Sequence, residues 1–125
     1  MNKLTPQEAQ RRASQAAGRR AERIAAWLLR LKGYSVLAQG LRHPAGEIDI
    51  LAKRGNVLAA IEVKQRGDLT AASEALRPRQ QARIMRAAEA YLARRPDASR
   101  LSLRFDVVLI ARGRFPRHIE DAWRA

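Results

Sequence analysis

Apolar residues recur with a helical period between residues 7 and 32, which predicts one long helix there. Thr5 is placed to cap this helix, with Pro6 at the first helical position and Glu8 in the first turn. Gly33 supplies the stop at the other end. One face of the helix collects small and aliphatic side chains and is expected to be buried: Ala13, Ala17, Ala21, Ile24, Leu28 and Leu31.

The polar–apolar pattern then changes to a period of two and predicts three strands, over residues 34–40, 46–53 and 56–64. The last two strands are separated by Arg54-Gly55-Asn56, a sequence typical of a tight hairpin turn. These two strands are therefore expected to pair in an antiparallel hairpin.

A second helical pattern covers residues 79–94 and is bounded by Pro78 and Pro96. Residues 101–111 predict a strand, and the continuous apolar run in its second half is typical of a strand covered on both faces. A short edge strand is expected within 115–119.

The resulting order, α-β-β-β-α-β, predicts an α/β fold with a central mixed β-sheet flanked by helices. A length of 125 residues suits a single domain, so we assign residues 1–125 to one unit. Residues 1–15 are expected to be either helical or a flexible N-terminal extension.

Charge adds a class of partner to this outline. The chain has 25 Lys and Arg against 12 Asp and Glu, a net charge of +13, which favours nucleic acid over a neutral partner. The alternative is an arginine-rich surface without a partner. No cysteine is available for a disulfide, a thiolate metal site or a nucleophile. No apolar run or signal peptide directs the chain to a membrane, so we expect a cytoplasmic protein with no membrane partner.

Acidic residues alternate with apolar ones in the predicted hairpin. The period of two places Glu47 and Asp49 on one face, opposite Ile48 and Ile50, and sets Asp49 near Glu62 across the hairpin. Two facing carboxylates repel each other unless a cation neutralises them, and Mg²⁺ prefers such ligands. The alternative is a solvent-facing ribbon, with Lys64 balancing the acids. Metal-assisted hydrolysis needs this combination of acids and a lysine.

The spacing from Asp49 through twelve residues to Glu62-Val63-Lys64 resembles the motif of the restriction-endonuclease-like PD-(D/E)xK superfamily, with Ile48 in place of the motif's proline. Six blocks in order resemble the UPF0102 (YraN-like) family, which is similar in fold to archaeal Holliday junction resolvases: GRRAE (18–22), GEIDI (46–50), IEVKQR (61–66), PRQQARI (78–84), RFDVV (104–108) and HIEDAW (118–123). The resemblance implies a restriction-endonuclease-like fold. That family has no characterised function, so the activity is an inference.

The resemblance also implies roles for individual residues. Asp49 and Glu62 would bind Mg²⁺ or Mn²⁺ together with the Val63 backbone carbonyl, and Lys64 would orient or deprotonate the attacking water or stabilise charge on the phosphate. Glu22 matches a helical acid that resolvase-like proteins direct toward the metal. The alternative for Glu22 is an exposed partner of an arginine.

Supporting residues are expected around these four. Gly18, one turn before Glu22, would allow the sheet or substrate to approach the helix. Glu47 would be an outer ligand or support the ligands. Gln81, on the buried side of the second helix, would either support the site or bond to nearby backbone.

Several arginines could hold a nucleic-acid backbone or form solvated faces: Arg66, Arg77, Arg79, Arg83 and Arg86, with Arg12, Arg19, Arg23 and Arg30 favoured as solvated. Asp106 is expected to pair with an arginine rather than act in catalysis. His43 and His118 are interpreted as incidental.

Three functions follow from this interpretation: a metal-dependent endonuclease acting on DNA, including branched or single-stranded forms, a DNA-binding or scaffold module without catalysis, or an RNA-processing nuclease. Resolvases act as dimers, so a homodimer is a further expectation, although nothing in the sequence identifies its surface.

Overall fold

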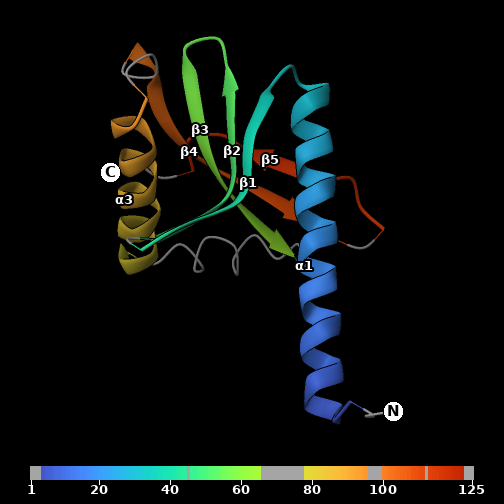
Figure 1. Ribbon diagram of the computed structural model, residues 1–125. Helices are drawn as coiled ribbons and strands as arrows, with labels where there is room; N and C mark the ends of the chain where they lie inside the picture. The colour runs from blue at the N-terminus through green and yellow to red at the C-terminus, as the bar shows by residue number, and fades with distance from the viewer. Residues whose placement is uncertain (1–3, 45, 66–77, 96–99, 112, 123–125) are drawn as a thin grey trace.

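The computed structural model describes residues 4–44, 46–65, 78–95, 100–111 and 113–122. Within these ranges the chain forms α1 (Pro6–Leu31), β1 (Ser35–His43), β2 (Gly46–Arg54), β3 (Val57–Gln65), α3 (Pro78–Ala93), β4 (Ser102–Ile110) and β5 (Arg117–Ile119). Figure 1 shows the sheet between the two helices, with α3 on one side and α1 on the other. The predicted α/β fold, with a mixed sheet flanked by helices, is confirmed.

The first helix begins at the predicted cap. The Thr5 hydroxyl accepts a hydrogen bond from the Glu8 N–H at 3.1 Å, and the Glu8 carboxylate accepts one from the Thr5 N–H at 2.8 Å. This reciprocal pair satisfies two backbone donors that a helix start would otherwise leave open. Residues 4–13 are all exposed, and the N-terminal half of α1 projects beyond the sheet (Figure 1). No described helix has the length and apolar character needed to cross a membrane.

The five strands form one sheet in the order β1-β2-β3-β4-β5. Only β3 and β4 pair in parallel, and the chain between them carries α3. The β2–β3 turn is as predicted, because Arg54 pairs with Val57 and Gly55 adopts a positive φ of 59°. β1 extends to His43, three residues beyond its predicted end, because its last residues pair with the start of β2 as far as Gly46.

Hydrophobic side chains form one core on each face of the sheet. The core beneath α3 contains Ile84, Ala87 and Ala88 of the helix, and the core beneath α1 contains five residues of the first helix and its C-terminal turn: Ala25, Ala26, Leu28, Leu29 and Tyr34. Residues of β4 enter both cores, which confirms that this strand is covered on both faces.

Backbone of α3 packs directly against Gly46, at the start of β2. A Cβ atom added there would lie 2.0 Å from the carbonyl oxygen of Arg83 in α3, whereas a Cβ at Gly18 would lie 3.8 Å from the Gln65 side chain. A methyl group therefore fits at Gly18, so the sheet does not need a glycine there, and an approach of substrate to Gly18 stays a prediction. Gly46 sets the distance between α3 and β2.

We predict that Gly46→Ala lowers the free energy of unfolding by about 1–3 kcal/mol, because the added methyl group forces backbone to move. Gly18→Ala is the matched control. It should be neutral or stabilising, by up to about 1 kcal/mol, because alanine favours a helix interior and the added methyl group makes only an ordinary van der Waals contact. Urea unfolding of both variants measures the difference, and equal losses would contradict the role assigned to Gly46.

Candidate active site

Strands β2 and β3 separate partway along their length. Their paired residues run from Arg54–Val57 to Ile50–Ile61, although β2 begins at Gly46 and β3 continues to Gln65. Beyond this point β2 stays paired with β1, and β3 stays paired with β4. Figure 1 shows the result: the start of β2 runs toward α3, and the end of β3 runs toward α1.

Asp49 lies at the point of separation. Its Oδ2 accepts a hydrogen bond of 2.9 Å from the Val63 N–H, in place of a backbone partner from β2. A strand residue directs its N–H and C=O toward the same neighbouring strand, so the Val63 carbonyl also faces β2. Asp49 and the Val63 backbone are therefore brought together, and metal binding by the Val63 carbonyl stays a prediction.

Strict alternation fails in β2 beside Asp49. Ile48 belongs to the core beneath α3, whereas Ile50 belongs to the core beneath α1. The prediction that these two residues share a face is therefore wrong, and the physical reason is that β2 no longer follows the β3 ladder here. In β3 the alternation holds, since Ile61 and Val63 pack in the core beneath α1.

Glu62 and Lys64 lie together at this end of β3. The Lys64 Nζ is 3.2 Å from a Glu62 carboxylate oxygen, and the exposed fractions of the two side chains are 27% and 12%. A hydrogen bond also joins the carboxyl groups of Glu62 and Asp49. The sequence correctly predicted that these three side chains meet.

Burial and mutual repulsion favour protonation of the carboxyl pair. Burial, reinforced by the Asp49 charge and opposed by Lys64, raises the pKa of Glu62 to about 7. Burial also raises the pKa of Asp49, but the Val63 N–H, the Glu62 hydrogen bond and Lys64 oppose this effect. Both shifts have the same direction, so each carboxyl group keeps its proton to a higher pH than an isolated carboxyl group does.

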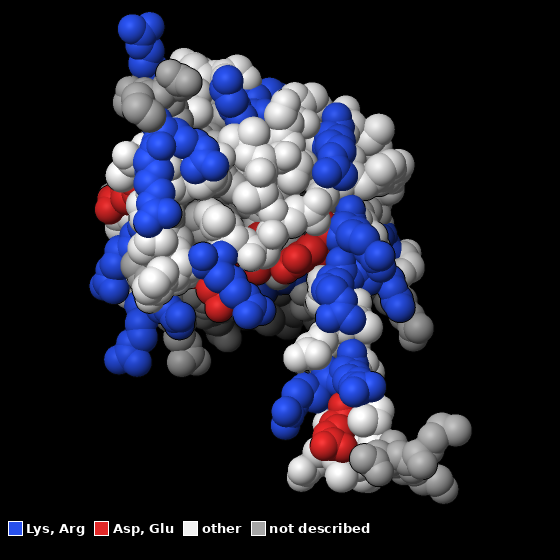
Figure 2. Space-filling view, viewed as in Figure 1, with Lys and Arg blue, Asp and Glu red and all other residues white. Residues whose placement is uncertain are grey.

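Two further acids act on this pair. Glu22 is half-buried on α1, and burial together with the Asp49 charge raises its pKa. Glu47 is exposed and contributes to the raised pKa of Asp49. Figure 2 shows acidic atoms beside the middle of α1 with Lys and Arg atoms around them. The predicted acids thus influence one another across α1, β2 and β3.

The oxygen donors of this site suit a hard divalent cation. Two half-buried carboxyl groups and a backbone carbonyl are ligands that Mg²⁺ and Mn²⁺ accept. A cation would favour the ionised carboxylates, which burial and neighbouring acids disfavour. Among the described residues, no three His, Cys, Asp or Glu side chains form a group suited to hold a metal ion. Asp49 and Glu62 would thus supply two ligands, and the role of Glu22 as a third stays a prediction.

The supporting residues have different outcomes. Gln81 is half-buried in the first turn of α3 and makes a polar interaction, and Arg79 and Arg83 are exposed on the same helix. Arg66 and Arg77 lie outside the described residues.

A separate polar cluster surrounds Asp106, whose side chain is fully buried. Arg104 donates two hydrogen bonds to its carboxylate, at 2.9 and 2.8 Å, and the Asp121 N–H donates a third at 3.0 Å. Although burial opposes ionisation, hydrogen bonds from His118, Arg104 and Asp121 lower the pKa of Asp106 to about 2. The prediction that Asp106 pairs with an arginine is confirmed.

His118 belongs to this cluster, so its interpretation as incidental is wrong. Its Nε2 lies 2.8 Å from the Asp106 carboxylate, and its Nδ1 contacts the Lys32 ammonium group at the end of α1. The Lys32 contact requires Nδ1 to accept, so Nε2 donates to Asp106. The sequence offered no signal for this contact, because 86 residues separate His118 from Lys32.

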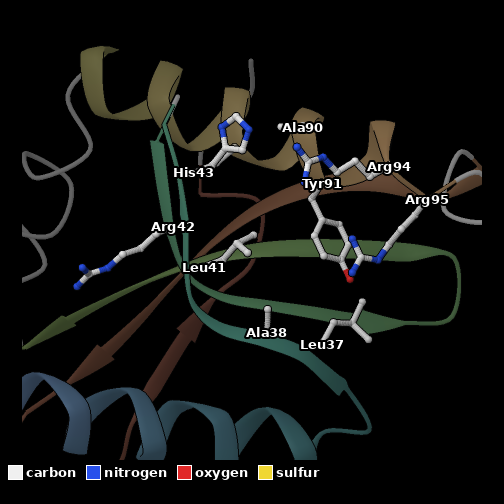
Figure 3. Close-up of a pocket in the computed structure, with 10 residues that line it drawn as sticks. Leu37, Ala38, Leu41, Arg42, His43, Ala90, Tyr91, Arg94 and Arg95 are labelled. Carbon is white, nitrogen blue, oxygen red and sulfur yellow. The ribbon is translucent and has the colours of Figure 1, made fainter.

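A pocket of about 290 Å³ lies between β1 and α3. Figure 3 shows Tyr91 and Arg95 close together on its helical side, where the guanidinium carbon of Arg95 is 3.8 Å from the ring centroid. Leu37 and Ala38 approach from β1. None of the four predicted catalytic residues lines this pocket.

Comparison with known proteins identifies the family. The model of the uncharacterised protein family UPF0102 matches residues 21–110, which include all four candidate catalytic residues. The chain belongs to the UPF0102 family. It is 59% identical to a UPF0102 protein of Parvibaculum lavamentivorans, over 86% of this chain and 80% of that protein. It is also 51% identical to a UPF0102 protein of Paramagnetospirillum magneticum, over 99% and 98% of the two chains.

Two aspartates of this UPF0102 chain, the half-buried Asp49 and the fully buried Asp106, should respond oppositely to neutralisation. We predict that Asp49→Asn in chelator retains or raises the melting temperature, because it removes repulsion while an amide oxygen can still accept from Val63. Asp106→Asn should cost about 3 kcal/mol, because it weakens a buried, fully paired carboxylate. Thermal unfolding compares the two, and a large loss in Asp49→Asn would identify Asp49 as a structural acid.

Stability should also depend on pH through Glu62. Because folding raises its pKa from 4.5 to about 7, the folded chain binds more protons than the unfolded chain between these values. The free energy of unfolding contributed by Glu62 therefore falls as pH rises through this range. Each pKa unit of difference between the folded and unfolded chain changes the free energy of unfolding by about 1.4 kcal/mol. Urea unfolding in chelator at a series of pH values measures this change.

Glu62→Gln should remove most of the fall in the free energy of unfolding with rising pH, because a glutamine side chain does not ionise. Glu89→Gln, which changes an exposed acid on α3, is the matched control and should keep the wild-type profile. An unchanged profile in Glu62→Gln would contradict the assignment of this pH dependence to Glu62.

Proposed function

We propose that this protein is a metal-dependent endonuclease that hydrolyses phosphodiester bonds in DNA. The observation that carries the proposal is the half-buried Asp49–Glu62 carboxyl pair with Lys64 beside it, at the point where β2 leaves β3. Repelling carboxyl groups reduce the stability of the fold, so their presence is best explained by a ligand that neutralises them.

Asp49 and Glu62, with the Val63 carbonyl, would hold Mg²⁺ or Mn²⁺. When bound, such an ion lowers the pKa of a coordinated water and polarises the phosphate. Lys64, whose ammonium group lies 3.2 Å from Glu62, would orient the attacking water or stabilise charge on the phosphate. Glu22 and Glu47 would act on the site through their charges.

The net charge of +13 supports a nucleic-acid substrate. Exposed arginines line α1 and α3, and Figure 2 shows basic atoms around the acidic site. A phosphate backbone attracted by these charges would approach carboxylates that would otherwise repel it, so binding of the metal and of the substrate would assist each other.

The test is incubation with Mg²⁺ or Mn²⁺ and a panel of linear, flapped, single-stranded and four-way DNA, with matching RNA strands and with Asp49→Ala as the control. Cleavage by the wild type alone supports the proposal. Salt-dependent binding without cleavage on any member would instead favour a DNA-binding or scaffold module, and cleavage confined to RNA would favour an RNA-processing nuclease.

Lys64 should act mainly in the transition state. We predict that Lys64→Ala lowers single-turnover cleavage by about 10²-fold or more, the scale of a positioned catalytic group. DNA affinity should stay within a few-fold of wild type, because one charge among many changes the overall field little. If binding weakens strongly while cleavage of bound DNA is unchanged, Lys64 is a phosphate-binding residue rather than a catalytic one.

A further inference from the structure

A groove runs along α1 beside the candidate active site. Its volume is about 560 Å³, and its walls come from α1, the end of β3, the end of β4 and the segment that leads to β5: Ala17, Arg20, Ala21, Ile24, Gln65, Ile110, Ala111, Gly113, Arg114 and Pro116. Figure 1 shows that the β4–β5 segment passes beside α1. We call these ten residues the α1 groove.

The α1 groove adjoins the candidate active site at two places in the chain. Ala21 of the groove directly precedes Glu22, and Gln65 directly follows Lys64. A polymer bound at Asp49 and Glu62 would therefore have a path leading away from the carboxyl pair along α1.

The residues of the groove suit a ligand that is both apolar and anionic. Most of them present alanine, isoleucine or proline side chains, whereas Arg20 of α1 and Arg114 of the segment between β4 and β5 add positive charge. Gln65 adds an amide that can donate and accept hydrogen bonds. Asp and Glu are absent from the described residues that line the groove. Bases and sugars present apolar surfaces between phosphates, so a nucleic-acid strand matches this pattern.

Phe115 is the second observation, and it is independent of the groove's lining. It lies between Arg114 and Pro116, and 78% of its side chain is exposed. That value is higher than for any other exposed large hydrophobic side chain among the described residues. An exposed aromatic ring next to an arginine is the arrangement with which proteins stack an unpaired base.

We propose that the α1 groove binds an unpaired segment of a nucleic-acid strand next to the candidate active site, with Phe115 stacking on one of its bases. The proposal rests on the proposed function only in its choice of nucleic acid as the substrate. It predicts a preference for single-stranded or frayed substrates over continuous duplex, because a base must be unstacked before Phe115 can contact its face.

The test measures binding in chelator, where cleavage does not interfere. The probe is a twelve-nucleotide oligothymidylate that carries one 2-aminopurine, placed at successive positions, together with its uridylate counterpart and a blunt duplex. We expect wild-type binding to quench 2-aminopurine at a subset of positions, and the single strand to bind more tightly than the duplex.

Variants separate stacking from general apolar contact. Phe115→Leu should weaken single-strand binding about tenfold and abolish the quenching, whereas Phe115→Trp should retain both because it keeps an aromatic face. Arg20→Gln should weaken binding and reduce the slope of log affinity against log salt by about one, as expected for one lost phosphate contact. Leu37→Ala, which changes an exposed apolar residue on β1 at the other edge of the sheet, should have no effect.

Two outcomes would overturn the proposal. In the first, oligonucleotides bind with wild-type affinity and quenching in Phe115→Leu. In the second, sedimentation shows a dimer that Phe115→Leu dissociates while oligonucleotide binding is unchanged, which would make the groove an interface between copies of the chain. Neither outcome bears on cleavage by Asp49, Glu62 and Lys64, and single-strand binding without cleavage would reject the nuclease while retaining the groove.

Discussion

The separation of β2 from β3 beyond the Ile50–Ile61 pair determines where polar chemistry can occur in this fold. Up to that pair the two strands exchange backbone hydrogen bonds and carry buried apolar residues on both faces. Beyond it, β1–β2 and β3–β4 continue as two separate pairs, so backbone groups that would have met across the ladder face a gap. The Asp49 carboxylate satisfies one of them by accepting from the Val63 N–H. This hydrogen bond fixes the Asp49 side chain at the point where the two strands separate.

The buried Asp106 site and the half-buried Asp49–Glu62 site use acidic residues in different ways. Asp106 receives hydrogen bonds from Arg104, His118 and the Asp121 backbone, and its pKa is held at about 2. Its charge is satisfied, and it joins β4, β5 and the end of α1. Asp49 and Glu62 have Lys64 as a nearby cation, and their pKa values are raised instead. A satisfied carboxylate stabilises the fold, whereas an incompletely neutralised pair retains affinity for a cation.

The sequence predicted the elements and the close approach of Asp49, Glu62 and Lys64, because both depend on local periodicity and a short hairpin. It did not predict the features that depend on distant contacts. Ile48 and Ile50 break the alternation because β2 leaves its ladder, which a count of residues cannot reveal. The Arg83 backbone leaves no room for a side chain at Gly46, although the two residues lie more than thirty positions apart. His118 contacts Lys32, from which 86 positions separate it. Such constraints exist only once the elements have packed.

The position of Gly46 links the packing of α3 to the geometry of the Asp49–Glu62 carboxyl pair. Gly46 lies three residues before Asp49 on the part of β2 that has left β3, and the Arg83 carbonyl oxygen leaves no room for a side chain there. The α3 backbone therefore limits how far the start of β2 can move toward the helix. On the other side of the gap, the pairing of β3 with β4 from Glu62 to Gln65 fixes Lys64. The distance between the carboxylates is thus set by two rigid supports that belong to different parts of the sheet, and a change in either would alter how a cation or a phosphate fits between them.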